Sequence, residues 1–495
     1  MIRLLMLAAL AACAPKQAPV AAEPPPAPVD PEAWRATRPS APPPREWKAP
    51  AATTFKLQNG IPVYLVKQGD LPLVSVRLLV NAGRDSNPKG KAGLSAITAN
   101  MLDEGTKTRD GATLAADAAR LGAELRVSPA AESTTVSLDA LSGENLGPSL
   151  DILADVVLRP RFDKKDFARV VDEVTTGIVA ARAEPRDVAQ RTFLAQLYGA
   201  DHPYGVPSVG TEASVKALKL SDLTAHYAAQ WHAGNAALVV SGNIDEATLK
   251  PLLDARFGTW KAGKGGRTAV PAPVAPVKTR VVFVEQPGSV QSVINAGTLA
   301  PSRTSEPYWP AQVAVTLFGG MFSSRLNMNL REEHGWSYGA YAGFADARDS
   351  SALIARSSVQ ADKTAPAVAE VLEEMGAQAS RVPSAEEMTL VRDYLVKSLP
   401  GNFATNAAAA ATYVSVPAFG LPATAWTDYG QSVTSVSADA AATAGKSLLD
   451  PAKSLVVVVG PRTAETDDGK GGKANVDVVA ELKALGYEFV EVRAP

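Results

Sequence analysis

Residues 319–344 hold the two side chains best suited to contact a ligand, Arg331 and Tyr338. The segment reads GGMFSSRLNMNLREEHGWSYGAYAGF, and at Gly335 it changes from a helix-like pattern to a small, aromatic, extended one. Arginine carries a planar set of donors that stays charged, and tyrosine adds a phenolic donor. On either side of a tight turn, the pair could bind a peptide carbonyl or stabilise an oxyanion. The alternative is structural: an exposed arginine at a helix end and a half-buried tyrosine in a strand.

The histidines do not have the spacing of a metal site. The chain has His202, His226, His232 and His334, and no two of them are three or four residues apart, which is the spacing that shares one helix face. His334 ends a predicted helix, where a positive charge favours the helix dipole. The only cysteine is Cys13, and no G-x-S-x-G turn occurs. The residues therefore predict neither a histidine metal site nor a nucleophilic site.

The elements predicted in the first half combine strands and helices. Residues 55–67 read as a hairpin with Asn59-Gly60 as its turn. Leu94, Ile97 and Met101 have helical spacing and predict a helix over 90–102. Further strands are predicted at 73–82, 133–141 and 236–241, and further helices at 112–121, 146–158, 163–183, from 185 onward, and 221–230.

The second half repeats this order. Asn81-Ala82-Gly83 matches Asn295-Ala296-Gly297, each predicted to end the strand before a pair of helices, so we expect a duplicated α+β unit. Residues 402–412 are Ala-rich and predict a packing helix, and 463–473 predict a polar loop. Further strands are predicted at 280–285, 292–297, 352–358 and 454–460, and further helices at 307–317, 323–333, 364–378 and 385–398.

Length and composition exclude several classes of protein. At 495 residues the chain should hold more than one domain. Apolar residues make up 46% and charged residues 20%, and the net charge of −2 argues against a nucleic-acid binder, which would carry a basic surface. No internal apolar run reaches the roughly 20 residues that span a bilayer.

The N-terminus predicts export. Residues 1–13, MIRLLMLAALAAC, read as a secretory signal, and Leu-Ala-Ala-Cys at its end resembles the bacterial lipoprotein signal, in which the cysteine (here Cys13) is lipidated. Ala14 follows rather than Asp, so the resemblance implies the outer membrane, facing the periplasm. Residues 14–53 are Pro/Ala-rich and read as an extended tether to the lipid anchor.

Three segments together resemble the M16 family of zinc metallopeptidases, the group of pitrilysin, insulin-degrading enzyme and the mitochondrial processing peptidase. They are NAGRDSNPKGKAGLSAITANMLDEGT at 81–106, HPYGVPSVGT at 202–211 and LREEHGWSYGAY at 330–341. The resemblance implies an α+β fold of two homologous domains, 54–260 and 279–495, joined by a linker at 261–278, each with a mixed, mostly antiparallel sheet flanked by helices. It also implies that Arg331 and Tyr338, seven residues apart, contact substrate near the scissile bond.

The same resemblance implies that the zinc motif is lost. The family binds zinc through H-x-x-E-H on one helix, where two histidines one turn apart hold the ion and the glutamate acts as base. These positions correspond here to Ala96, Ala99 and Asn100. Alanine has no donor atom and asparagine is a poor zinc ligand. The third ligand position matches Glu173, which cannot hold zinc alone, so we expect no zinc in this chain.

Three functions follow as hypotheses. Some bacterial M16 peptidases are heterodimers in which one subunit carries zinc and the other supplies the Arg/Tyr pair. This chain is similar to the second kind, so we expect a zinc-bearing M16 partner, a peptide or unfolded polypeptide as substrate, and no activity alone. The alternative is a non-catalytic scaffold of the cell envelope, since M16-type chains also serve as core subunits of respiratory complexes. An autonomous peptidase with an unrecognised site is disfavoured by the missing histidines.

Overall fold

The structure is a computed structural model that describes residues 32–37, 47–267, 269–467, 469 and 471–494. The chain divides into two units, Met1–Trp47 and Lys48–Pro495. The described part of the first unit contains a 3-10 turn at Ala33–Ala36, where the sequence predicted extended geometry. The predicted signal peptide, Cys13 and most of the predicted tether lie outside the described residues.

The second unit is folded from its first residues. Ala49 is buried, and the Tyr413 hydroxyl donates a hydrogen bond of 2.6 Å to the carbonyl of Pro50. The folded body therefore starts several residues before the expected position 54. Within the described residues, no helix is both long enough and apolar enough to cross a bilayer.

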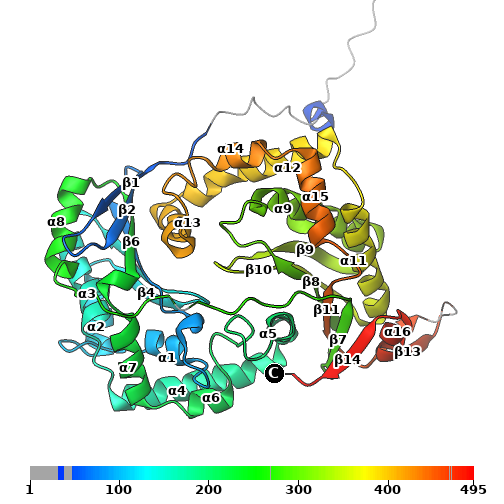
Figure 1. Cartoon of the computed structure of the whole chain (residues 1–495), viewed down its shortest axis with the longest axis horizontal. Coiled ribbons are helices and arrows are strands. Elements are labelled where there is room, and N and C mark those ends of the chain that lie inside the picture. The colour runs from blue at the N-terminus through cyan, green and yellow to red at the C-terminus, as the bar shows by residue number, and fades with distance from the viewer. Residues whose placement is uncertain (1–31, 38–46, 268, 468, 470, 495) are drawn as a thin grey trace, which may run out of the picture. The chain divides into compact units, whose positions relative to one another are not determined.

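The first sheet has six strands in the order β1-β2-β6-β3-β5-β4 (Figure 1). They are β1 (Ala52–Lys56), β2 (Pro62–Lys67), β3 (Leu73–Val80), β4 (Glu124–Pro129), β5 (Thr134–Leu141) and β6 (Ala236–Gly242). Neighbours are antiparallel except β2 and β6. β1 and β2 form the predicted hairpin, and Gly60 in its turn has a φ of 88°, which glycine adopts without strain.

The helices of the first half form two groups. Those of the first group, α2 (Gly111–Arg120), α3 (Leu146–Leu158) and α8 (Glu246–Phe257), share one apolar core with the sheet. Those of the second group, α1 (Leu94–Asn100), α4 (Lys164–Ala180), α6 (Glu212–Lys216) and α7 (Leu220–Gln230), pack on one another through a separate cluster. α1 begins at Leu94, later than predicted, because Gly93 has a left-handed φ of 89°.

The second sheet has six strands in the order β14-β7-β11-β8-β10-β9 (Figure 1). They are β7 (Arg280–Glu285), β8 (Gln291–Ala300), β9 (Ser337–Ala345), β10 (Ser351–Gln360), β11 (Leu455–Gly460) and β14 (Glu488–Val492). β7 is parallel to both of its neighbours, and the other pairs are antiparallel. The predicted α+β class with mostly antiparallel sheets is confirmed.

Two predictions in the second half need correction. The helix predicted over 323–333 is present from Arg325, but only α10 (Arg325–Asn327) is α-helical and Met328–Glu333 forms a wider π-helical turn. The expected polar loop at 463–473 lies largely in a two-stranded hairpin, β12 (Thr463–Asp467) with β13 (Lys473–Asp477). Both hairpin strands are mostly solvent-exposed, so their polar composition resembled that of a loop.

Further helices of the second half are α9 (Tyr308–Val315), α11 (Thr364–Ala379), α12 (Ala385–Ser398), α14 (Tyr429–Thr434), α15 (Ala438–Leu448) and α16 (Val478–Ala484).

The two sheets share the arrangement of five strands and differ at one edge, where β1 is antiparallel to β2 but β14 is parallel to β7. In each, a strand late in the chain (β6 or β11) lies parallel to the first long strand (β2 or β7) and antiparallel to the next (β3 or β8). The predicted duplication is therefore visible in the strand order. The motif used to detect it is not equivalent in the two halves, because Asn81 follows the end of β3 whereas Asn295 lies inside β8.

Each half contributes a helix to the sheet of the other half. α5 (Pro185–Tyr198) packs on β8 and β11 through a cluster that includes Val188 and Phe193. α13 (Asn406–Phe419, orange in Figure 1) packs on β3 and β6, where the small side chains Ala409 and Ala410 are fully buried. The Ala-rich segment is thus a packing helix as predicted, and residues 48–495 are tied into one unit.

Candidate functional site

The zinc-motif positions lie on α1, and their side chains carry no zinc ligand. Ala96 and Ala99 are buried, at 1% and 0% exposure, and Asn100 at the helix end is half-buried. α1 packs on α7, α4 and β4. The positions predicted for the zinc motif therefore hold two buried methyl groups and one half-buried amide.

Glu173, at the third ligand position, lies on α4 with its side chain 58% exposed. Its carboxylate accepts a hydrogen bond of 2.7 Å from the guanidinium of Arg169, which also pairs with Glu104. Among the described residues, no group of three or more His, Cys, Asp or Glu side chains could hold a metal ion. These positions do not fit a zinc ion.

The four histidines occupy four separate environments. His202 Nε2 lies 2.8 Å from the Pro271 carbonyl, and His226 Nε2 lies 3.0 Å from the Ser86 hydroxyl. Burial lowers the pKa of His226 to about 4, so its imidazole is neutral at physiological pH. His232 is buried against the glycine-rich segment that follows residue 260, and His334 stacks on a tryptophan ring with centroids 4.0 Å apart. The structure brings no two of them together.

Arg331 lies in the π-helical turn Met328–Glu333. Its side chain is 37% exposed, and its guanidinium carbon lies 4.7 Å from the ring centroid of Phe322, which is itself 55% exposed. Its nearest carboxylate is that of the neighbouring Glu332, at 3.4 Å. Since an exposed neighbouring pair of this kind is weak, the guanidinium remains free to bind a ligand.

Tyr338 lies on β9, the edge strand of the second sheet, and is 92% exposed. The turn between it and Arg331 contains Gly335, whose φ is 66°. β9 is held in place by Asn327, whose side-chain oxygen accepts a hydrogen bond of 3.1 Å from the backbone N–H of Ala340. The structural alternative of a half-buried tyrosine is therefore wrong, because Tyr338 presents an exposed phenol at the edge of the sheet. The described structure shows no contact between Arg331 and Tyr338.

Tyr338 borders a cavity of 580 Å³ between α5 and the strands β8, β9 and β10. Four separate elements supply its lining: Arg186 and Gln190, Val293 and Asn295, Tyr338, Gly339 and Tyr341, and Arg356, Ser357 and Ser358. The sequence analysis missed this site because its parts are distant in the chain. One signal was present, since Arg356 is the single charged residue in the strand SALIARSSVQ.

A second group of polar side chains joins loops from both halves. The Glu132 carboxylate, 7% exposed, accepts hydrogen bonds of 3.0 and 3.2 Å from the backbone N–H of Arg348 and a further one from the Tyr204 hydroxyl. The Arg348 guanidinium also contacts Asn81. Nearby, Asp85 is 6% exposed, and its Oδ1 has no hydrogen-bond partner in the described structure. Burial, and secondly the charge of Glu132, raises the pKa of Asp85 to about 6.

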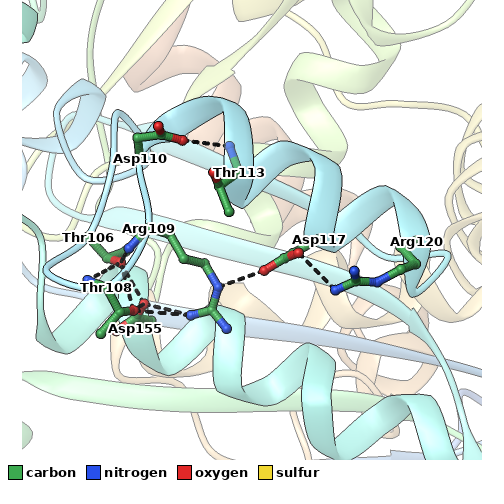
Figure 2. A network of polar contacts seen from close by, with 8 residues as sticks. All are labelled: Thr106, Thr108, Arg109, Asp110, Thr113, Asp117, Arg120 and Asp155. Carbon is green, nitrogen blue, oxygen red and sulfur yellow. Dashed lines mark hydrogen bonds and ion pairs between the residues drawn. The ribbon is translucent and has the colours of Figure 1, made fainter.

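A third polar group fixes the segment that follows α1 (Figure 2). Asp155 on α3 is fully buried and accepts hydrogen bonds from the hydroxyls of Thr106 and Thr108, both at 2.6 Å. Arg109 and Arg159 add charged hydrogen bonds of 2.8 and 2.6 Å. Burial alone would raise the pKa of Asp155, but these hydrogen bonds outweigh it and lower the pKa. The network is structural, since both carboxylate oxygens of Asp155 accept hydrogen bonds from side chains of the chain itself.

Comparison with known proteins identifies the family. The sequence profile described as "Insulinase (Peptidase family M16)" matches residues 63–211, and the one described as "Peptidase M16 inactive domain" matches residues 217–395. An uncharacterized zinc protease of Mycobacterium bovis is 30% identical over 313 residues, which cover 62% of this chain and 69% of that protein. The chain belongs to peptidase family M16.

Solved structures agree on the fold of this M16 chain. A peptidase M16 inactive domain from Pseudomonas fluorescens superposes with a TM-score of 0.78 at 23% identity, covering 83% of this chain and 98% of that one. A chain of Complex III2 from Candida albicans superposes with a TM-score of 0.70 at 17% identity, covering 82% and 95%. Relatives are called zinc proteases, whereas the positions predicted for the zinc motif in this M16 chain are Ala96, Ala99 and Asn100.

Proposed function

We propose that this chain is the substrate-binding subunit of a two-chain M16 peptidase. The observation that carries the proposal is the contrast between two sites in one fold. The helix that holds zinc in the family has alanine, alanine and asparagine at the motif positions. In contrast, Tyr338 stands 92% exposed on a fixed edge strand beside a cavity, with Arg331 across the preceding turn.

Arg331 and Tyr338 would act on a peptide through hydrogen bonding and charge. The Tyr338 hydroxyl can donate to a peptide carbonyl oxygen, and the Arg331 guanidinium can stabilise negative charge that develops on that oxygen. Tyr338 lies at an irregularity of β9 between two paired positions, Ser337 and Ala340, and Arg331 lies in a helical turn, so both backbones are held close to positions for binding. A partner chain with an intact H-x-x-E-H motif would supply zinc and its activated water.

The location of the complex is part of the same proposal. The signal at residues 1–13 would direct export, and a lipid on Cys13 would hold the body at the outer membrane, facing the periplasm. Replacement of Cys13 by Ser tests this point. The variant should lose labelling by a fatty acid and should leave the membrane fraction, whereas unchanged labelling would refute the anchor.

The central experiment measures hydrolysis of a fluorogenic peptide by the full chain alone, by a zinc-motif M16 chain from the same genome alone, and by their mixture. We expect no hydrolysis from this chain alone and more from the mixture than from the partner. In the mixture, Arg331→Ala and Tyr338→Phe should each lower kcat by about 100-fold, with a smaller effect on KM. Tyr394→Phe removes a phenol that is 43% exposed on α12 and serves as the control. Zinc-dependent hydrolysis by this chain alone would refute the proposal.

The scaffold function is kept as a second candidate because a chain of similar fold occurs in Complex III2. The absence of a described contact between Arg331 and Tyr338 also fits this candidate, since nothing then requires them to act together. Under this hypothesis no zinc-motif chain gains activity on mixing, and Arg331→Ala leaves assembly with any partner unchanged. Under the peptidase hypothesis the same substitution lowers turnover without weakening assembly.

A further inference from the structure

The cavity beside Tyr338 is positively charged. Its lining includes Arg186 and Arg356, and none of the described residues that line it is a carboxylate. Neither arginine forms an ion pair with a described residue, whereas most of the arginines in the folded unit do. A concave surface that concentrates one sign of charge attracts ligands of the opposite sign.

Arg356 lines this cavity from β10, and its side chain is exposed there. On β10 it pairs with Asn295 of β8 on one side and Tyr341 of β9 on the other. Side chains directly opposite one another on neighbouring strands share a face, so these three form a row across the sheet. The guanidinium donates one hydrogen bond of 2.9 Å to the side-chain oxygen of Gln190 and keeps further donors for a ligand. Partial desolvation lowers the pKa of Arg356, and the described residues that line the cavity include no carboxylate to offset it.

Arg186 forms part of the facing wall. It lies four residues before Gln190 on α5, so both side chains point from the same face of the helix. The cavity is therefore bounded by one arginine from the first half of the chain and one from the second. Two cations on opposite walls, with amide and hydroxyl groups between them, suit a planar anion that accepts several hydrogen bonds.

Arg356 could have the purely structural role of connecting the sheet to α5. Arg280 makes a similar connection, so the surroundings of the two arginines can be compared. Arg280 on β7 also reaches α5, where it donates a hydrogen bond of 3.4 Å to the Gln196 carbonyl. That arginine lines a different cavity, which contains the carboxylate of Glu488. An arginine can therefore connect the sheet to α5 beside an acidic group. The hydrogen bond from Arg356 to α5 does not explain why no carboxylate is found among the described residues that line its cavity.

We propose that this cavity binds a carboxylate of the peptide substrate through Arg356 and Arg186. The inference rests on the proposed function, because it assumes that Tyr338 contacts a peptide. The carboxylate can come from a Glu or Asp side chain close to the residue that meets Tyr338, or from the C-terminus of a short peptide. In both cases the group that the cavity recognises is a carboxylate, and a neutral amide at the same position binds less well.

The test measures binding of fluorescein-labelled peptides to the full chain by fluorescence anisotropy. Four peptides of one sequence carry either Glu or Gln at a central position and either a free or an amidated C-terminus. We expect a carboxylate to strengthen binding by about tenfold or more at low salt, and less at high salt. Arg356→Gln and Arg186→Gln should each remove most of this preference, while Arg280→Gln should leave it intact. Arg186 is exposed, so its replacement is readily tolerated by the fold.

Each outcome decides the proposal. A preference for Glu over Gln that both cavity variants abolish supports it with the side chain as source, and a preference only for the free C-terminus supports it with the terminus as source. Equal binding of all four peptides overturns the carboxylate site but leaves a peptide-binding subunit intact. A preference that survives both cavity variants also overturns it. Binding of no peptide overturns this inference and contradicts the proposed function as well.

Discussion

Asp85 gives the sharpest prediction about stability, because its carboxyl is buried and one of its oxygens has no hydrogen-bond partner in the described structure. An ordinary aspartate pKa of 3.8 and the folded value of about 6 lie about two pKa units apart. At ~1.36 kcal/mol per unit, the ionised form costs about 3 kcal/mol in the folded state. Asp85→Asn removes this charge while keeping the shape of the side chain.

The sign of the effect follows from linkage. The folded pKa of Asp85 lies above the unfolded one, so the folded state binds the proton more tightly. Its contribution to stability is fully present below about pH 4 and is lost as the pH rises through about 6. We therefore expect Asp85→Asn to be more stable than the natural chain at pH 7.5, by up to about 3 kcal/mol, and equally stable near pH 4.

Urea unfolding of the full chain, followed by tryptophan fluorescence from about pH 4 to about pH 8, measures this difference. Asp201→Asn is the matched control, because the Asp201 side chain is 92% exposed and its change should leave the midpoint unmoved at every pH. Glu132, Arg348 and Arg267 also act on Asp85, so their effects are included in its pKa. Identical pH profiles for Asp85→Asn and the natural chain, or a variant less stable at pH 7.5, would refute the reasoning.

Three further predictions concern the packing of this chain. Asp155→Asn should lower the free energy of unfolding by on the order of 2–3 kcal/mol, less than for a fully buried pair because its arginine partners are partly exposed, as measured by urea unfolding. The triple variant A96H/A99E/N100H should bind no stoichiometric zinc by elemental analysis and should melt at a lower temperature, since both alanine sites are buried. Ala409→Leu should cost about 1–3 kcal/mol, again by urea unfolding, because it inserts volume between α13 and the first sheet.

Substitutions at exposed positions of the same helices serve as controls for the stability predictions. Asp151→Asn on the same helix α3 changes a carboxylate that is 55% exposed, so it should cost far less than Asp155→Asn. Ala411→Leu lies on the exposed side of α13 and should change stability by under about 0.5 kcal/mol. Equal costs within either pair would contradict the packing described. Tight zinc binding by the triple variant would show that α1 still presents a metal site.

The sequence by itself determined the properties that depend on local residue types. The Asn59-Gly60 turn predicted the hairpin of β1 and β2, and the apolar periodicity predicted α1, which the structure has in shorter form. Ala96 and Ala99 have no donor atoms in any fold, so the residue types alone predict that these positions hold no zinc. The α+β class and the family followed from the same segments. The role of Arg331 and Tyr338 remains a prediction, since the fold positions them without showing what they bind.

Only the tertiary structure decided the properties that depend on neighbours distant in the chain. Arg356 becomes a candidate ligand because α5, from the other half, closes a cavity over its strand. Asp85 acquires its unusual pKa from burial and from Glu132, which comes from a separate loop. The exchange of α5 and α13 between the sheets leaves no local sequence signal, because any apolar helix face could pack on either sheet. Burial and electrostatic energies depend on the distances between side chains, and the fold sets those distances.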